Sequence, residues 1–456
     1  MSSTAAAILL SRGQKARLAL YALACSVLLL WDYVYFFYLL NFAICFMYFA
    51  VTVFKLLIVG LSWWRRPQIV VPDEEIRALS DDILPVYTVL IPLYKEANVV
   101  ARIIRSIESL DFPKQKLDVK LLLEADDAAT AEAVRSVESV LDLGVVIVPA
   151  AGPRTKPKAC NAGLERARGE LVVVYDAEDR PEPDQLKKAV LALRNAEPEV
   201  ICLQCKLKYY NPHQNWLTRS FSIEYAAWFD LFLPGLHGLG LPIPLGGTSN
   251  HFRTHVLREL GGWDPYNLAE DCDLGIRIHA RGYRTRILDS TTWEEANSRL
   301  WNWLRQRSRW IKGYIQTFLV FTRHPIRLLR QLGLKGFTGF LLTVGGFTLI
   351  QLLNPIYWIA AALHCVYRWR MLYPGDVVSE FFFAASITLA FSNILFIAVN
   401  LFAALELRSR RMAVYALLSP LYWALMSLAA WRGLLQLFRR PFYWEKTEHG
   451  LDLEAG

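Results

Sequence analysis

The sequence Ala-Glu-Asp-Cys-Asp-Leu-Gly at residues 269–275 is followed by Gln-Arg-Ser-Arg-Trp at residues 306–310. An acidic pair such as Glu270-Asp271 is common and, taken alone, indicates a solvated turn. A Gln-x-x-Arg-Trp sequence that begins 35 residues after Asp271, just ahead of a long apolar segment, is a rare conjunction with it. This conjunction makes the region 246–310 the predicted functional centre of the chain.

The composition predicts a soluble domain framed by membrane segments. Hydrophobic residues make up 54% of the 456 residues, too many for an ordinary soluble protein, yet 20% are charged and most of these lie in the middle of the chain. The net charge of +8 does not indicate nucleic acid, because the basic residues gather at the ends of apolar segments, where they contact anionic lipid head groups. We therefore expect membrane lipids as partners and no nucleic acid.

Residues 1–67 are predicted to form an N-terminal membrane region. The apolar run 17–62 has 46 residues, about twice the ~20 that one membrane helix needs. We expect two helices with a break near Asn41, and no cleavage, because the run is far longer than a signal-peptide core. The sequence Trp63-Trp-Arg-Arg-Pro67 then supplies interfacial aromatic side chains, basic anchors and a helix stop.

Residues 68–297 show the pattern of an α/β domain. Apolar runs suited to buried parallel strands alternate with helical periodicity, at residues 87–94, 119–123, 145–148 and 171–175. This alternation predicts a doubly wound, mostly parallel sheet. Ligands bind beyond the carboxyl ends of such strands, and acidic residues follow three of these runs, at Glu96, Asp126 and Asp176.

The last part of the chain is predicted to return to the membrane. Residues 298–335 form an interfacial amphipathic stretch, residues 336–438 hold about four membrane helices, and residues 439–456 form a cytoplasmic tail. The apolar run 336–367 has 32 residues, or about 48 Å of helix, which exceeds a ~30 Å hydrocarbon core. We therefore expect a break at Asn354-Pro355 and six membrane helices in all, with both chain ends in the cytoplasm.

Taken together, the Glu-Asp pair, the Gln-x-x-Arg-Trp sequence and the membrane segments resemble membrane-embedded family-2 glycosyltransferases, the group of the cellulose, chitin and hyaluronan synthases. The resemblance is close from residue 87 to about residue 320 and only general in the membrane parts. It implies a cytoplasmic glycosyltransferase-A-type domain that takes a UDP-sugar donor, in a multi-pass protein of the bacterial inner (cytoplasmic) membrane.

On the donor side, the resemblance implies contacts from three segments. Tyr94 and Glu96 match a Pro-x-Tyr-x-Glu sequence whose glutamate lies near the uridine. Asp126 matches an aspartate that holds the base or ribose, although the residues after it depart from the usual Asp-Gly-Ser. Lys158 matches a lysine near the diphosphate, and a surface position on a helix is its alternative.

Asp176 and Glu178 suit a divalent metal ion, Mg²⁺ or Mn²⁺. They lie two positions apart just beyond a strand, so both carboxylates reach one hard cation. Such an ion offsets the charge of a departing diphosphate. Glu178 replaces the usual second aspartate, and the adjacent Asp179 is therefore an alternative ligand that also fits a helix N-cap.

On the acceptor side, inverting transfer needs a base that takes the proton of the attacking hydroxyl. Asp271 occupies that place by resemblance, although Ala269 replaces the usual threonine, and Asp273 is a nearby alternative. An amide, a permanent cation and an indole face suit the leaving diphosphate and the acceptor sugar. The residues expected there are Glu270, Gln306, Arg309 and Trp310.

The expected function is inverting transfer of a hexose from a UDP-sugar to a growing β-linked polysaccharide. Glucose is expected from the resemblance to bacterial β-glucan synthases, and coupled translocation with export partners is a further expectation. Two alternatives stay open: addition of one or a few sugars to a lipid acceptor, and a non-catalytic membrane scaffold or transport subunit. The retained acidic residues argue against the scaffold.

Overall fold

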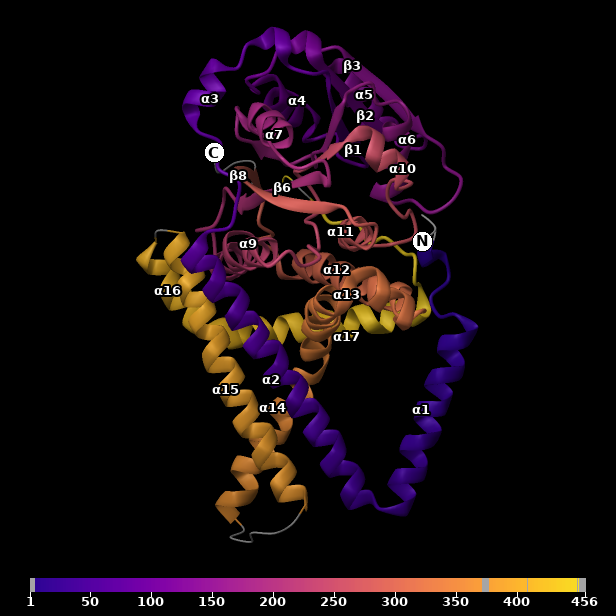
Figure 1. Cartoon of the computed structure of the whole chain (residues 1–456), viewed down its shortest axis with the longest axis vertical. Coiled ribbons are helices and arrows are strands. Elements are labelled where there is room, and N and C mark those ends of the chain that lie inside the picture. Colours follow the sequence, from indigo (N-terminus) through magenta and orange to yellow (C-terminus); the bar gives the residue numbers. More distant parts are fainter. Residues whose placement is uncertain (1–4, 371–376, 408, 449, 451–456) are drawn as a thin grey trace.

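The structure is a computed structural model that describes residues 5–370, 377–407, 409–448 and 450. Its upper part is built on an eight-stranded sheet, and its lower part consists of long apolar helices (Figure 1). The strand order is β3-β2-β1-β4-β7-β6-β8-β5. The strands are β1 (Tyr87–Leu93), β2 (Leu117–Glu124), β3 (Leu143–Val148), β4 (Leu171–Val174), β5 (Arg180–Pro181), β6 (Val200–Tyr209), β7 (Asn250–Arg253) and β8 (Arg284–Glu294).

The sheet is mostly parallel and is covered on both faces. Strands β1 to β4 pair in parallel, whereas β7 runs antiparallel to its neighbours β4 and β6. Along β1, Val89 and Ile91 pack in one hydrophobic core and Leu90 packs in the other. Burial on both faces explains why these strands are continuous apolar runs. The predicted doubly wound α/β architecture is confirmed.

Ten helices surround this sheet or follow directly from it in the described part of the chain. Their amphipathic faces supply the two cores; on α4, for example, Ile103, Ile104 and Ile107 are buried at helical spacing. The helices are α3 (Asp73–Ala78), α4 (Val100–Glu108), α5 (Ala128–Ser136), α6 (Lys156–Glu165), α7 (Gln185–Arg194), α8 (Trp216–Tyr225), α9 (Leu233–Gly238), α10 (Thr254–Glu259), α11 (Glu270–Ala280) and α12 (Leu300–Phe321).

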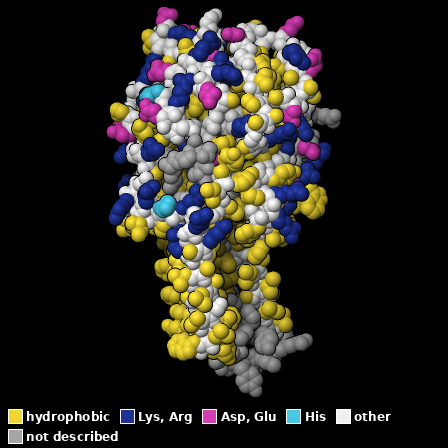
Figure 2. All heavy atoms as spheres, turned by 90° about the vertical axis from the view of Figure 1, so that its right-hand side faces the viewer, with side chains coloured by type: hydrophobic (Ala, Val, Ile, Leu, Met, Phe, Trp, Pro, Cys, Tyr) yellow, Lys and Arg dark blue, Asp and Glu magenta, His cyan; other side chains and the backbone are white. Residues whose placement is uncertain are grey.

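The lower part contains the helices that can cross a membrane. The described residues hold four helices that are long and apolar enough to do so, or five if each bent pair of helices counts as one span. The sequence predicted six. Hydrophobic side chains cover this lower part, while charged side chains gather on the upper part (Figure 2). The helices are α1 (Arg12–Trp31), α2 (Tyr33–Arg65), α13 (Pro325–Phe340), which continues through a π-helical turn (Leu341–Gly346) into α14 (Phe347–Arg370), and α15 (Val377–Glu406).

Two predicted helix breaks are wrong. The N-terminal break lies at Asp32 rather than Asn41, because the Asp32 carboxylate accepts a hydrogen bond from the Tyr35 backbone N–H, at 2.9 Å, and caps α2. No break occurs at Asn354-Pro355, since Pro355 lies inside α14. There the Tyr48 hydroxyl donates to the Asn354 side chain at 2.8 Å, and this contact between α2 and α14 holds the helix through the proline.

The apolar segment 412–438 does not form a straight span. It folds into α16 (Arg410–Leu417) and α17 (Ser419–Arg439), with a bend of 57° between them. Helix α17 lies across the long axis of the molecule, beneath the sheet, and packs against α12 (Figure 1). The fully buried Trp303 of α12 contacts Tyr422 of α17, with ring centres 5.2 Å apart.

Both described ends of the chain contact the upper part. The backbone N–H of Ala6 donates to the Asp264 carboxylate at 2.7 Å. At the other end, Lys312 on α12 donates to the Tyr443 carbonyl oxygen at 2.9 Å. The described residues just after α17 therefore lie against α12.

Helix α12 approaches the start of α11 so closely that only glycine fits at the contact. A Cβ at Gly313 would lie 2.3 Å from the backbone nitrogen of Ala269. We expect Gly313→Ala to lower the free energy of unfolding by about 1–3 kcal/mol and to displace the Glu270-Asp271 turn, because overpacked cores strain their neighbours. Thermal unfolding in detergent and glycosyl transfer would both measure this.

Gly60→Ala is the matched control, since a Cβ at Gly60 on α2 meets nothing within 4 Å. An equal loss of stability in both variants would contradict the packing argument.

Candidate active site

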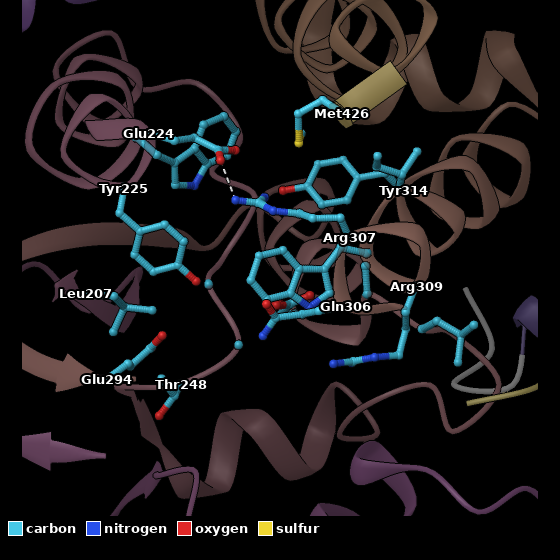
Figure 3. A pocket seen from close by; sticks show the side chains of 18 of the residues that line it. Leu207, Glu224, Tyr225, Thr248, Glu294, Gln306, Arg307, Arg309, Tyr314 and Met426 are labelled. Carbon is cyan, nitrogen blue, oxygen red and sulfur yellow. Dashed lines mark hydrogen bonds and ion pairs between the residues drawn. The ribbon is translucent and has the colours of Figure 1, made fainter. Parts of the chain in front are cut away.

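A cavity of about 400 Å³ lies between the sheet and the apolar helices. Its upper end is lined by residues that follow β1 and β4, its middle by α11 and α12, and its lower end by α2, α14, α15 and α17. Figure 3 shows Gln306 and Arg309 extending into it from α12, opposite Glu294 and Thr248. Most of the predicted donor and acceptor residues therefore share one connected space with the apolar helices.

The structure brings most of the predicted site residues to this cavity, but not all of them. Those that line it are Tyr94, Glu96, Asp176, Glu178, Glu270, Asp271, Gln306, Arg309 and Trp310. Asp126 lies outside the lining, where its carboxylate pairs with Arg154 at 2.8 Å. Lys158 also lies outside, and its ammonium is 3.6 Å from the Glu124 carboxylate.

Lys156, rather than Lys158, faces the cavity from the first turn of α6. Positions two apart lie on opposite sides of a helix, so only one lysine of Lys-Pro-Lys can face inward. Lys156 pairs with the Asp176 carboxylate and donates to the Gly247 carbonyl oxygen at 2.7 Å. Burial lowers the pKa of Lys156, but the carboxylates of Asp176 and Glu270 outweigh it and raise the net pKa, so the side chain stays cationic.

The acidic cluster after β4 divides into a structural residue and two cavity residues. Asp179 is buried, and its carboxylate accepts hydrogen bonds from the Asp176 backbone N–H at 2.7 Å and from the Thr248 hydroxyl. This carboxylate fixes the loop on which Asp176 and Glu178 reach the cavity. Burial, followed by the charges of Asp176 and Glu178, raises the pKa of Asp179 well above its ordinary value.

The donor half carries more negative charge than its cations balance. Burial and the charges of Asp179, Glu178 and Asp176 raise the pKa of Glu294 well above its ordinary value, and one Asp179 carboxylate oxygen is buried without a hydrogen-bond partner. The oxygen ligands fit a hard divalent cation. The described residues contain no group of three His, Cys, Asp or Glu side chains that forms a complete metal cage. This donor set suits an ion held by one or two carboxylates and by substrate phosphates.

Asp271 lies in the first turn of α11, across the cavity from Lys156. One of its carboxylate oxygens accepts from the Cys272 backbone N–H at 2.7 Å. The other faces Gly247, where a Cβ would lie 3.5 Å from it and 3.8 Å from the Lys156 ammonium. Burial and the charge of Glu270 raise the pKa of Asp271 to about 7. A carboxylate with that pKa has a high proton affinity near neutral pH, as a general base requires.

Arg309 offers a positive charge that no described carboxylate neutralises by direct contact. Its guanidinium makes no hydrogen bond or ion pair with the described residues and lies 5.3 Å from the centre of the Trp444 ring. The charges that act on it are those of Glu270, Asp176, Asp271 and Glu178. A guanidinium in this position can bind the oxygens of a leaving diphosphate.

Sequence reasoning missed Arg307, the second residue of the Gln-x-x-Arg-Trp sequence. Its guanidinium pairs with Glu224 on α8, as Figure 3 shows, and donates to the Tyr422 hydroxyl at 3.2 Å. It also lies over the rings of Phe221 and Trp310, 4.3 and 4.7 Å from their centres. These contacts orient Trp310 at the cavity wall.

The C-terminal segment was also missed. The Lys446 ammonium lies 3.5 Å from the Glu96 carboxylate and donates to the Tyr94 carbonyl oxygen. The rings of Trp444 and Tyr94 are 6.3 Å apart. The aromatic and basic residues of 442–446 indicate a membrane-interface anchor in sequence, but the structure places them against the donor end of the cavity.

Known proteins resemble this chain in sequence and in fold. A family profile described as "Glycosyltransferase like family 2" matches residues 85–313. The chain belongs to this family. Probable glycosyltransferase YdaM of Bacillus subtilis is 29% identical over 252 residues, which cover 54% of this chain and 60% of that protein. Beta-monoglucosyldiacylglycerol synthase of Synechocystis is 27% identical over 266 residues, which cover 55% of this chain and 53% of that protein.

These two matches span little more than half the length of the curated relatives, and they do not single out the cellulose, chitin and hyaluronan synthases. Among solved structures, the mannosyltransferase PcManGT from Pyrobaculum calidifontis, in complex with GDP-Man and Mn²⁺, has a TM-score of 0.52 and 23% identity. The match covers 87% of this chain and 99% of that one. The likeness shows the fold, and the predicted glycosyltransferase-A-type domain is confirmed.

Asp271→Asn tests the predicted base directly. We expect UDP binding near the wild-type value and a kcat loss of about 10²–10⁴-fold, because the amide cannot take a proton. Asp273→Asn is the comparison, since Asp273 is buried and pairs with Arg277 at 2.7 Å. It should lower the thermal midpoint instead. Wild-type turnover in Asp271→Asn would exclude this residue as the base.

The same residue predicts a pH dependence. Because the pKa of Asp271 is raised to about 7, the predicted base is protonated below that pH, where it cannot accept a proton, and ionised above it. We expect kcat/KM of the wild type to fall about tenfold for each pH unit below 7. A flat profile between pH 5 and 7 would show that no group with this pKa controls the reaction.

Proposed function

We propose that this chain is an inverting glycosyltransferase that transfers a hexose from a UDP-sugar to a hydroxyl group of a membrane-bound acceptor. The observation that carries the proposal is the single cavity that joins the carboxylates of Asp176 and Asp271 to the space between the apolar helices. Such a connection lets a water-soluble nucleotide sugar bind at one end of the cavity and a membrane-bound acceptor bind at the other.

The donor half supports binding of a nucleoside diphosphate sugar. Lys156 and Arg309 provide cationic groups for the diphosphate oxygens, and Tyr94 and Glu96 line the edge next to β1. Asp176 and Glu178 are the residues that would hold Mg²⁺ or Mn²⁺, which would supply positive charge to the departing UDP. Asp126 and Lys158 do not line the cavity and act indirectly. Asp126 pairs with Arg154, and Lys158 pairs with Glu124, and both of these partners line the cavity.

The acceptor half supplies the base. As the acceptor hydroxyl approaches, its proton passes to the Asp271 carboxylate, its oxygen bonds to the anomeric carbon, and the bond from that carbon to UDP breaks. UDP leaves with the electron pair of that bond, and attack from the opposite side inverts the configuration. Trp310 offers an indole face on which the acceptor sugar or head group can lie.

The lower end of the cavity favours a lipid acceptor. It ends at Tyr48 and Asn354, which hydrogen bond to each other at 2.8 Å. Just beyond them, the Tyr357 hydroxyl donates to the Asn41 side chain at 3.1 Å. A cavity bounded by the apolar helices suits a lipid that enters between them, and one relative is named for a glucosylated diacylglycerol.

Synthesis of a polysaccharide is the second candidate function. The wall of the cavity presents Trp310 stacked on Tyr225, with ring centres 6.5 Å apart, next to Phe229. Aromatic faces of this kind are suited to successive sugar rings. A growing chain would require the contacts at Tyr48 and Asn354 to open.

Removal of divalent cations tests the donor half. We expect EDTA to abolish transfer and Mn²⁺ or Mg²⁺ to restore it, and Glu178→Ala to weaken metal-dependent UDP binding. Asp179→Ala should instead lower the thermal midpoint, because Asp179 holds the Asp176 backbone and Thr248. Full activity in EDTA would exclude a metal-dependent reaction.

The acceptor is tested with the purified chain in membranes. Radiolabelled UDP-sugars, UDP-glucose first, are incubated with the protein in lipid vesicles, and the products are partitioned between an organic and an aqueous phase. We expect label in the organic phase, as one or a few sugars on a lipid. Label confined to a large, water-soluble, hydrolase-sensitive product would establish the polysaccharide candidate instead.

A further inference from the structure

Lys55 is a charged side chain at the lower end of the cavity, among the apolar helices. It lies on the same face of α2 as Tyr48. Its ammonium is 4.6 Å from the centre of the Phe396 ring and 5.6 Å from the centre of the Phe347 ring. It makes no hydrogen bond or ion pair with any residue that the structure describes. A charge at such a depth is costly, and it commonly marks a ligand pathway.

The charges around Lys55 leave one positive charge in excess. The charged residues that line this end of the cavity are Lys55, Glu224 and Arg307. Glu224 is the carboxylate whose charge acts on Lys55, but it is already paired with Arg307 and accepts from the Tyr422 hydroxyl at 2.6 Å. Two cations therefore share one carboxylate, so an anionic ligand is the complement of this site.

Amide side chains surround the same space. On α15, Asn393 and Asn400 lie on the same face as Phe396. On α14, Gln351 and Asn354 lie on one face. Asn393 makes no hydrogen bond with any described residue, and the side-chain oxygen of Gln351 is buried without a partner. The amide N–H groups of Asn393 suit anionic oxygens, whereas that of Asn400 donates to the Ser419 hydroxyl at 2.7 Å. The unpaired Gln351 oxygen suits a hydroxyl donor.

We propose that this end of the cavity binds the phosphate of an anionic membrane lipid with a hydroxylated head group, and that this lipid is the acceptor. The identity of the acceptor rests on the proposed function, whereas the lipid site itself does not. The phosphodiester lies against Lys55, the acyl chains contact Phe347 and Phe396, and a head-group hydroxyl extends along the cavity to Asp271. Transfer then follows the step above: the hydroxyl oxygen bonds to the anomeric carbon, its proton passes to Asp271, and UDP departs.

The full-length protein in vesicles tests this directly. Apparent KM values are measured for phosphatidylglycerol and for diacylglycerol with the same acyl chains, in the wild type, Lys55→Gln, Lys55→Arg and Arg65→Gln. Arg65 is the matched control because it is an exposed cation at the end of α2. We expect the wild type to prefer phosphatidylglycerol by about tenfold or more, as a charge-assisted contact provides.

That preference should disappear in Lys55→Gln, persist in Lys55→Arg and be unchanged in Arg65→Gln. An unchanged preference in Lys55→Gln would overturn the proposal. UDP binding by calorimetry with Mn²⁺ should be equal in all four proteins, because Lys55 lies away from the donor end, and this equality shows that each variant is folded.

A second measurement separates the lipid site from the transfer reaction. Native mass spectrometry compares phosphatidylglycerol with phosphatidylcholine retained by the wild type and by Lys55→Gln. Lys55-dependent retention without transfer to lipid would support the site and overturn the acceptor assignment. Transfer to lipid without such retention would leave the proposed function intact and overturn the site. Displacement of the lipid by inorganic phosphate at equal concentration would show that the site takes free phosphate, which also overturns it.

Discussion

The close packing of α12 is the constraint on which the rest of the site depends. On one side a Cβ at Gly313 would meet the Ala269 backbone, and on the other a Cβ at Gly433 of α17 would lie 2.7 Å from the Ser308 carbonyl oxygen. Between these contacts α12 carries Arg309 and its neighbours into the cavity. Asp271, Arg309 and Trp310 keep their positions relative to one another because two backbone contacts leave α12 no room to shift.

The charges of the two ends of the cavity are opposite, and this difference fits two different ligands. At the donor end, the raised pKa values of Asp179 and Glu294 reflect carboxylates that lack sufficient positive charge nearby. At the lower end, Lys55 and Arg307 share Glu224. The divalent ion of the proposed donor complex would bring positive charge to the first end, and the proposed anionic acceptor would bring negative charge to the second. Each proposed ligand thus supplies the charge that its end of the cavity lacks.

Strands β1, β2 and β4 were predictable because both of their faces are buried, which makes each of them a continuous apolar run. Strand β8 gave no such signal, because charged and polar residues alternate with few apolar ones along it. The choice between Lys156 and Lys158 was not predictable, since it depends on how α6 is rotated about its axis. Neither was the contact of Lys446 with Glu96, because the two residues are 350 positions apart and no local pattern links them. The course of α17 was missed for a related reason: an apolar segment can pack under a domain as well as cross a membrane, and length does not separate these outcomes.

The ion pair between Arg307 and Glu224 lies where the polar and apolar parts of the site meet, and its surroundings explain why arginine is suited to this position. The guanidinium pairs with Glu224 at one edge, while its flat faces contact the rings of Phe221 and Trp310. A lysine could neutralise the carboxylate but could not stack on the rings, so the indole would lose its support. Because Arg307 is buried and Glu224 is half-buried, loss of either one leaves an uncompensated charge beside the proposed acceptor path. The orientation of Trp310 and the charge balance around Lys55 therefore depend on the same pair, which couples the aromatic wall to the proposed anion site.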